Sequence, residues 1–264
     1  MTKITVLNKP KLKNPILIEG LPGVGNIGRV AVGYMIEELK AKKFAELRSK
    51  WFFPFVMLQD SYQIHLVKNE FYYCKAKKKG QRDLILLVGD CQSLAPQGHY
   101  EVCNEILDFA KSFNCKEVIT LGGLATGELE KKPEAIGALT HKENLKKYKG
   151  TGIDFSAGDR VGYIVGAAGL LLGLGKERGM RGLCILGETS GFPIVTDPKA
   201  AEVVLRSLMK ILNIRLDMSK LEQRVKEMEK FIKRVENLQR KALMEISKEA
   251  KAPVTGKEQL RYIG

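Results

Sequence analysis

Gly23, Gly25 and Gly28 form a G-x-G-x-x-G pattern that could bind a phosphate group or a dinucleotide. The pattern follows an apolar run at 16–19 and opens a candidate helix at 27–40, which is the context of a dinucleotide-binding loop. Two features oppose this: the next expected strand, at 44–48, is polar, and the chain has no Gly-Lys-Ser/Thr sequence. The competing interpretation is a tight glycine turn that packs the helix on the sheet. A nucleotide- or nucleoside-binding α/β enzyme that uses the Gly23–Gly28 turn is therefore the alternative function.

Two acidic residues, Asp90 and Glu188, follow or end candidate strands. Ligands of open α/β sheets bind at the carboxyl ends of strands, so both acids could line a site, or each could cap a helix or orient a loop. In the sequence, no second carboxylate or His lies near either of them. Ser190 lies in Gly-Glu-Thr-Ser-Gly, which is not the G-x-S-x-G of a nucleophile elbow. The histidines form no metal-ligand spacing and no evident triad with a Ser or Cys: His65, His99 and His141.

We therefore expect no catalytic residues, no cofactor and no metal, although a site assembled from loops stays open. The five cysteines contain no C-x-x-C pair, so neither a zinc site nor a thioredoxin-type motif is suggested: Cys74, Cys91, Cys103, Cys115 and Cys184. Buried reduced thiols of a cytosolic protein are the expected state.

The formal net charge of +14, from 44 Lys+Arg against 30 Asp+Glu, invites a nucleic-acid or membrane-surface function. The basic residues are mainly Lys, with clusters at 75–79 and 142–149, whereas proteins that read bases favour Arg and stacking aromatics. No helix-turn-helix, RNA-recognition or zinc-finger pattern is present. The charge therefore predicts a solvated surface that favours an acidic protein partner, with neither nucleic acid nor a membrane as partner.

The chain has no apolar leader, and its longest uncharged apolar stretch, 161–175, is about 15 residues against the roughly 20 of a membrane span. We expect a soluble, cytoplasmic protein.

Strand and helix patterns alternate over the first two thirds of the chain. Continuous apolar or alternating runs predict strands at 4–7, 16–19, 52–58, 64–66, 71–75, 84–88, 118–121, 135–139 and 183–186. Helices are predicted at 27–40, 100–113, 142–148, 163–176 and 199–212. Lys68–Glu70 is expected to be a hairpin tip. This alternation predicts an α/β fold, a three-layer α/β/α core with a mostly parallel sheet.

The composition changes near Asp217. From Leu221 to Ile246, apolar residues recur at heptad a/d spacing between charges of both signs, which predicts a long helix of coiled-coil type. The pattern stops after residue 250, and the last residues contain Pro and Gly. The predicted organisation is an α/β core at 1–215, a helical extension at 216–250 and a flexible tail at 251–264.

An ordered set of segments resembles the proteasome assembly chaperone family. It begins with the strand and Pro-Gly-x-Gly-x-x-Gly turn of Ile18–Gly28 and continues through 84–90, 119–123, 162–175 and 184–189. The sequence is most similar to the archaeal branch, which carries a C-terminal helical extension and tail. The resemblance implies a core similar to that of nucleoside phosphorylases without their catalytic residues. It also implies a homo-oligomer that binds proteasome α-subunits.

The resemblance further implies a role for the chain end. Family members or their partners end in a hydrophobic–Tyr–any-residue motif that docks between α-subunits; here Tyr262 stands third from the end and Ile263 has no hydroxyl. The expected partner-binding residues are Leu260, Tyr262, Ile263 and Gly264. The expected function is that of a non-enzymatic assembly chaperone or ATP-independent activator of the proteasome, and a coiled-coil scaffold with an inert core is a further alternative.

Overall fold

The computed structural model describes residues 1–59, 62–127, 132–156, 161–191, 196–223 and 225–226. The chain forms two compact units, residues 1–222 and 223–264. Almost all of the second unit, which includes most of the predicted helical extension and the whole tail with Leu260, Tyr262, Ile263 and Gly264, lies outside the described residues. The fold described below is that of the first unit.

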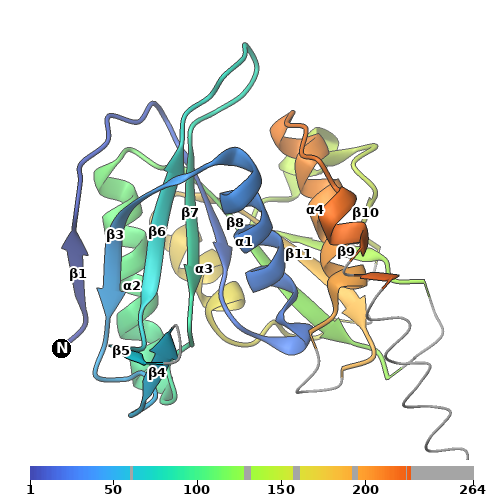
Figure 1. The fold of residues 1–264 in the computed structure, drawn as a ribbon. Helices are drawn as coiled ribbons and strands as arrows, with labels where there is room; N and C mark the ends of the chain where they lie inside the picture. Colours follow the sequence, from blue (N-terminus) through green and yellow to red (C-terminus); the bar gives the residue numbers. More distant parts are fainter. Residues whose placement is uncertain (60–61, 128–131, 157–160, 192–195, 224, 227–264) are drawn as a thin grey trace, which may run out of the picture. The chain divides into compact units, whose positions relative to one another are not determined.

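Within its described residues, the first unit is built on a nine-stranded sheet of order β1-β3-β6-β7-β2-β8-β11-β9-β10 (Figure 1). The strands are β1 (Lys3–Val6), β2 (Ile16–Gly20), β3 (Lys42–Arg48), β6 (Asn69–Cys74), β7 (Leu84–Gly89), β8 (Glu117–Ala125), β9 (Ala135–Leu139), β10 (Ile153–Asp154) and β11 (Arg181–Thr189). The central strands β7, β2, β8 and β11 are parallel. On either side of them the neighbouring strands β6 and β9 run antiparallel. The α/β class is confirmed, and the sheet is a mixed one whose parallel strands form its centre.

Two pairs of helices cover the sheet, one pair on each face. Helices α1 (Ile27–Leu39) and α4 (Pro198–Leu212) share one apolar core with the sheet, and α2 (Pro96–Ser112) and α3 (Ala167–Glu177) share the other (Figure 1). In β2, Leu17 belongs to the α2/α3 core, whereas Ile16 and Ile18 belong to the α1/α4 core. The central strands are apolar along their length because both of their faces are covered. The predicted three-layer core is therefore confirmed.

Several local predictions were wrong. The segment 44–48, expected to be a weak and polar strand at best, belongs to strand β3 (Lys42–Arg48) of the main sheet. Lys68–Glu70 is not a hairpin tip, because Val67 and Asn69 are buried where the chain enters β6. The strand before it, β5 (Gln63–Leu66), pairs instead with β4 (Val56–Gln59) in a separate two-stranded sheet. The segment Lys142–Tyr148 is a 3-10 helix, η2.

None of the helices in the described part of the chain has the length and apolar composition of a membrane-spanning segment.

Candidate functional site

The glycine turn that follows β2 is shaped by packing. Gly25 has a φ of 63°, which is a left-handed conformation that favours glycine. At Gly28, in the first turn of α1, a Cβ atom would lie 2.4 Å from the carbonyl oxygen of Leu121 in β8. The helix therefore approaches the sheet more closely than any other residue would allow. The turn interpretation explains these two glycines of the G-x-G-x-x-G pattern without a phosphate.

A crevice of about 630 Å³ lies beside this turn, at the carboxyl ends of the parallel strands. This is the position at which open α/β sheets bind ligands, and the volume is that of a small-molecule site. The turn residues Gly23 and Gly28 line it, as do Asp90 and His99. The described residues that line the crevice include no Lys or Arg. A phosphate bound there would have to rely on backbone N–H groups of the turn and of the first turn of α1, because the described lining supplies no cationic side chain from Lys or Arg.

Glu19 is the most unusual residue of the crevice. Its side chain is 1% exposed at the end of β2, and its Oε1 accepts a hydrogen bond of 2.8 Å from the backbone N–H of Leu21. Its Oε2 has no hydrogen-bond partner within the described structure. Burial raises the pKa of the carboxyl to about 8, so the group is protonated at neutral pH. Glu19 can therefore donate a hydrogen bond as the neutral acid, which is its main form at neutral pH.

The buried thiols on the same side of the sheet are unreactive. Burial raises the pKa of Cys103 in α2 and of Cys184 in β11 to about 12. The pKa of Cys91, which lines the crevice, is also raised by burial. Because the thiolate is the nucleophilic form of cysteine, these three residues do not provide a nucleophile at neutral pH.

Gln92 ties the rim of the crevice together. Its Nε2 donates to the carbonyl oxygen of Pro22 at 2.7 Å, and its Oε1 accepts from the N–H of Ala167 at 2.9 Å. The side chain thus joins the glycine turn to the start of α3. Both ends of the amide are used, so Gln92 positions the rim.

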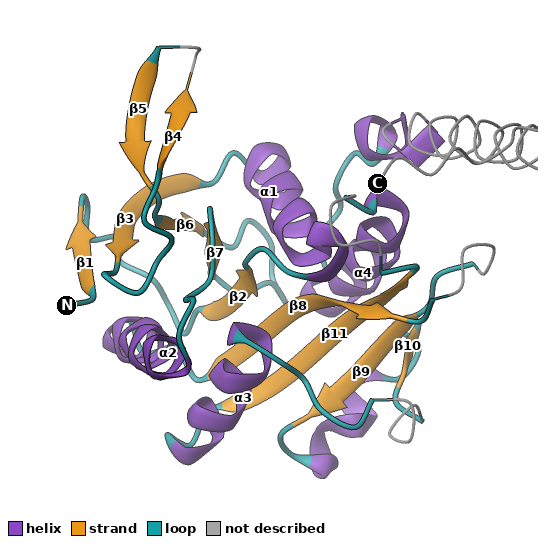
Figure 2. Cartoon of the chain, turned by 90° about the horizontal axis from the view of Figure 1, so that it is seen from below, coloured by secondary structure: helices purple, strands orange, loops and turns teal. Residues whose placement is uncertain are grey.

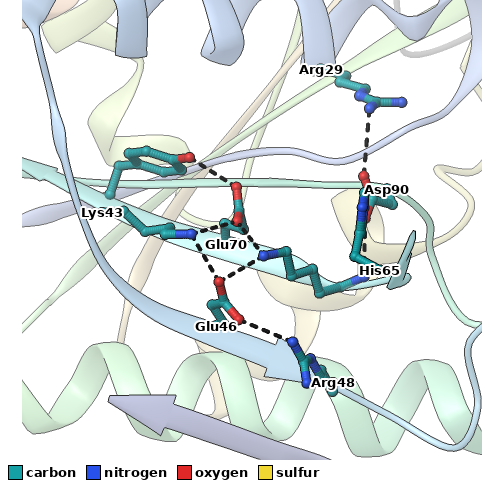
Figure 3. Close-up of polar contacts among 9 residues, drawn as sticks. Arg29, Lys43, Glu46, Arg48, His65, Glu70 and Asp90 are labelled. Carbon is teal, nitrogen blue, oxygen red and sulfur yellow. Dashed lines mark hydrogen bonds and ion pairs between the residues drawn. The ribbon is translucent and has the colours of Figure 1, made fainter. Parts of the chain in front are cut away.

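Asp90, at the end of β7, joins three segments of the chain. Its Oδ1 lies 3.7 Å from Arg29 Nη2 in α1, and its Oδ2 lies 3.4 Å from His65 Nε2 in β5 (Figure 3). Its Oδ2 also accepts a hydrogen bond from the N–H of Lys68. The fold brings His65 to Asp90, although the two residues are far apart in the sequence. Asp90 connects the crevice rim to the small β4–β5 sheet.

The other predicted site residues are dispersed. Glu188 is buried in β11 but is not among the described residues that line the crevice. His99 lines the crevice, and burial lowers its pKa. His141 Nδ1 contacts the hydroxyl of Thr140 at 2.7 Å, just after strand β9. Within the described residues, no group of three His, Cys, Asp or Glu side chains could hold a metal ion.

Sequence reasoning missed Glu19 and Gln92. A signal for Glu19 was present, since a carboxyl inside the apolar run 16–20 must be buried if the strand is central. Gln92 gave no signal, because its two partners are distant in the sequence.

Comparison with known proteins identifies the family. Residues 17–236 match the PAC2 family. The chain is 39% identical over 253 residues to an uncharacterized protein of Methanocaldococcus jannaschii, and the match covers 96% of this chain and 93% of that protein.

Two solved structures carry the comparison further. PbaB of Pyrococcus furiosus, an archaeal proteasome activator, is 43% identical with a TM-score of 0.85, covering 89% of this chain and 98% of that one. PbaA of the same organism, an archaeal homolog of proteasome-assembly chaperone, is 25% identical with a TM-score of 0.71, covering 93% and 97%. The resemblance derived from the sequence is thus confirmed: the chain belongs to the PAC2 family, alongside these archaeal relatives of the proteasome assembly chaperones.

Proposed function

We propose that this protein is a non-enzymatic assembly chaperone and ATP-independent activator of the proteasome, which binds the α-subunits as a homo-oligomer. The observation that carries the proposal is the 43% identity to the archaeal proteasome activator PbaB over 98% of that chain. A function that depends on the whole fold is the one most readily shared at this identity and coverage.

The chemistry of the crevice supports a binding role. Burial keeps the nearby thiols and Glu19 protonated at neutral pH. The described lining offers no Lys or Arg. These groups bind and position more readily than they catalyse, because none of them provides a strong nucleophile or a charge partner.

A nucleotide-binding enzyme is the competing function, predicted from the turn at Gly23–Gly28. The crevice gives it little support, because no Lys or Arg is found in its described lining and packing explains Gly25 and Gly28 without a phosphate. A thermal-shift screen separates the two functions. The proposal expects no shift with nucleosides, nucleotides or dinucleotides, whereas a defined, saturable shift with one of them would favour the enzyme.

The C-terminal tail is the part of the chain that we propose docks on the α-ring. Several tails on one oligomer would bind together and gain avidity through their effective concentration. The predicted contact residues are Leu260, Tyr262, Ile263 and Gly264.

Deletion of residues 260–264 is expected to leave the fold intact and to weaken α-ring binding at least tenfold. The measurement is a titration of purified α-rings with full-length and truncated protein, with peptide hydrolysis by the proteasome followed in the absence of ATP. Gln259→Ala is the matched control, since it changes the tail without touching the proposed contact residues. Undiminished binding by the truncated protein would refute the role of the tail. Failure of the full-length protein to bind α-rings would refute the proposed function itself.

A further inference from the structure

The β4–β5 hairpin reverses the usual placement of apolar side chains. Figure 2 shows it projecting from the body of the first unit. Its register pairs Val56 with Leu66 and Leu58 with Ile64, and Met57 with His65 between them. Because side chains alternate across a strand, the first two pairs share one face and the third pair lies on the other.

The inner face of the hairpin is attached to the body. Met57 packs against the α2/α3 core, and His65 Nε2 lies 3.4 Å from Asp90 Oδ2 (Figure 3). The two ends of the hairpin segment are anchored by Phe52 and Val67, each 5% exposed. These contacts fix which face points away from the body.

The outer face is entirely aliphatic and exposed. The exposed fractions are 46% for Val56, 70% for Leu58, 67% for Ile64 and 58% for Leu66. A strand with one solvated face normally places polar residues there. A two-stranded sheet is also only marginally stable alone in water. The four side chains together form the kind of apolar patch that marks an interaction site.

The charge around the patch restricts what can cover it. The chain carries a net charge of +14, yet residues 51–67 contain no Lys or Arg and a single acid, Asp60. An acidic partner would be drawn to the Lys-rich surface elsewhere and would gain nothing from this segment. Two copies of a basic chain repel each other over most of their surfaces, and an uncharged patch is where they can approach with least repulsion.

We propose that the outer face of the β4–β5 hairpin, made of Val56, Leu58, Ile64 and Leu66, docks against the same face of a second copy of this chain. The patch presents two aliphatic side chains on each of two strands, so a two-fold axis through its centre sets aliphatic side chains of one copy against aliphatic side chains of the other, in reciprocal pairs. Such an isologous contact is the commonest way in which a chain pairs with itself. The inference rests on the proposed homo-oligomer and assigns it an interface.

The test compares the mass of the assembled full-length protein with that of two hairpin variants. Leu58→Thr with Ile64→Thr removes apolar surface and places at both positions a β-branched side chain that suits a strand. Leu58→Glu with Ile64→Glu adds a repulsive pair to each copy. Leu145→Thr, at a 42% exposed residue of η2, is the matched control. Mass is measured by light scattering from 1 to 100 µM, after circular dichroism has established that each variant is folded.

The wild-type protein is expected to be dimeric or larger. The Thr pair should raise the dissociation constant of the hairpin interface at least a hundredfold, the Glu pair should abolish that interface, and the control should leave it unchanged. A wild type that is a single chain at 100 µM, or hairpin variants that keep the wild-type mass, would overturn the proposal. If the variants do not fold, single Cys variants at Val56, Leu58, Ile64 and Leu66, alone and mixed in pairs, replace them. Oxidation should link two copies through at least one pair of these positions, while Tyr163→Cys should not link them, and no link from any of the four counts against the interface.

Pull-down of α-rings by the same proteins separates this inference from the proposed function. A wild type that oligomerises but does not bind α-rings contradicts the proposed function and leaves the interface standing. Hairpin variants that keep their mass but lose α-ring binding would show that the patch docks on an α-subunit, and the inference would be wrong.

Discussion

Replacing Glu19 with Gln is expected to stabilise the protein at neutral pH, by an amount that grows as the pH rises from 5 to 8. Glu19 is 1% exposed and only one of its carboxyl oxygens has a hydrogen-bond partner in the described structure. Burial therefore raises its pKa from 4.5 to about 8 in the folded protein. Gln has a similar shape, can keep the acceptor for the N–H of Leu21, and binds no titrating proton.

The sign and size follow from proton linkage. Below pH 4.5 the carboxyl is protonated in both the folded and the unfolded chain, and its contribution to stability is fully present. Between pH 4.5 and 8 the unfolded chain releases the proton while the folded chain keeps it, so the free energy of unfolding falls by about 1.4 kcal/mol per pH unit. Between pH 5 and 7 the wild type should therefore lose about 2 kcal/mol relative to Glu19→Gln. Above pH 8 the difference should level off.

The assay is urea unfolding of both proteins at pH 5, 6, 7 and 8, read as the difference in the free energy of unfolding. Taking the difference cancels the titration of all groups that the two proteins share. Glu105→Gln, which removes an exposed carboxyl from α2, controls for the loss of one negative charge. A difference that does not change with pH would refute the reasoning, because it would mean that Glu19 titrates alike in the folded and unfolded chains.

Two further predictions test the packing and the ion pairs of the core. Gly28→Ala should lower the free energy of unfolding by about 2 kcal/mol, because its Cβ would overlap a backbone carbonyl of β8. Gly33→Ala, in the same helix, has open space around it and should raise the free energy of unfolding by a few tenths of a kcal/mol. Thermal unfolding of the two variants measures the difference. Glu117→Gln should cost about 3 kcal/mol at pH 7, because the 1% exposed carboxylate lies 2.7 Å from Arg82 and 2.6 Å from Lys147. These contacts lower the pKa of Glu117 in the folded protein, although burial acts in the opposite direction. The ionised carboxylate therefore stabilises the fold at pH values above the pKa of Glu in the unfolded chain, and this stabilisation is lost as the pH falls through the lowered pKa of the folded protein. In urea unfolding from pH 7 to 3, the free energies of unfolding of the wild type and Glu117→Gln should converge.

The parallel centre of the sheet could be predicted because its strands are covered on both faces. The apolar runs at 84–88, 118–121 and 183–186 became β7, β8 and β11, and the last two are longer than predicted. Their flanking polar residues, such as Glu117 and Thr189, are buried with hydrogen-bonded partners in the fold. A hydrophobic run marks the middle of such a strand, but only tertiary contacts decide where it ends.

Strand β3 gave only a weak signal in the sequence, because its polar residues find their partners in β3 itself, at Lys68 and in β6. Glu46 accepts from Lys43 at 2.9 Å and from Lys68 at 2.7 Å, and Lys43 also reaches Glu70 in β6 (Figure 3). Together these contacts lower the pKa of Glu46 to about 2 despite the opposing effect of burial. The neighbours Phe44, Ala45 and Leu47 are fully buried, with a register shift between residues 43 and 45 that interrupts the alternation. Period-two patterning fails where a bulge occurs and where the polar partners are more than 20 residues away.

The two positions that break the rule of apolar inside and polar outside have different consequences for function. Glu19 places a carboxyl in the core, where it can be kept only as the neutral acid, and it lines a crevice where an uncharged ligand could use its proton. Leu58 and Ile64 expose aliphatic side chains to water. Their burial by a partner would contribute favourable free energy to binding, since apolar surface would leave water. A fold with a core this extensive does not need either feature for stability, so a functional role is the more economical explanation of both. Because Glu19→Gln alters only the interior and the hairpin variants alter only the surface, their effects on stability and on assembly should be separable, and a double variant should show the sum of the two.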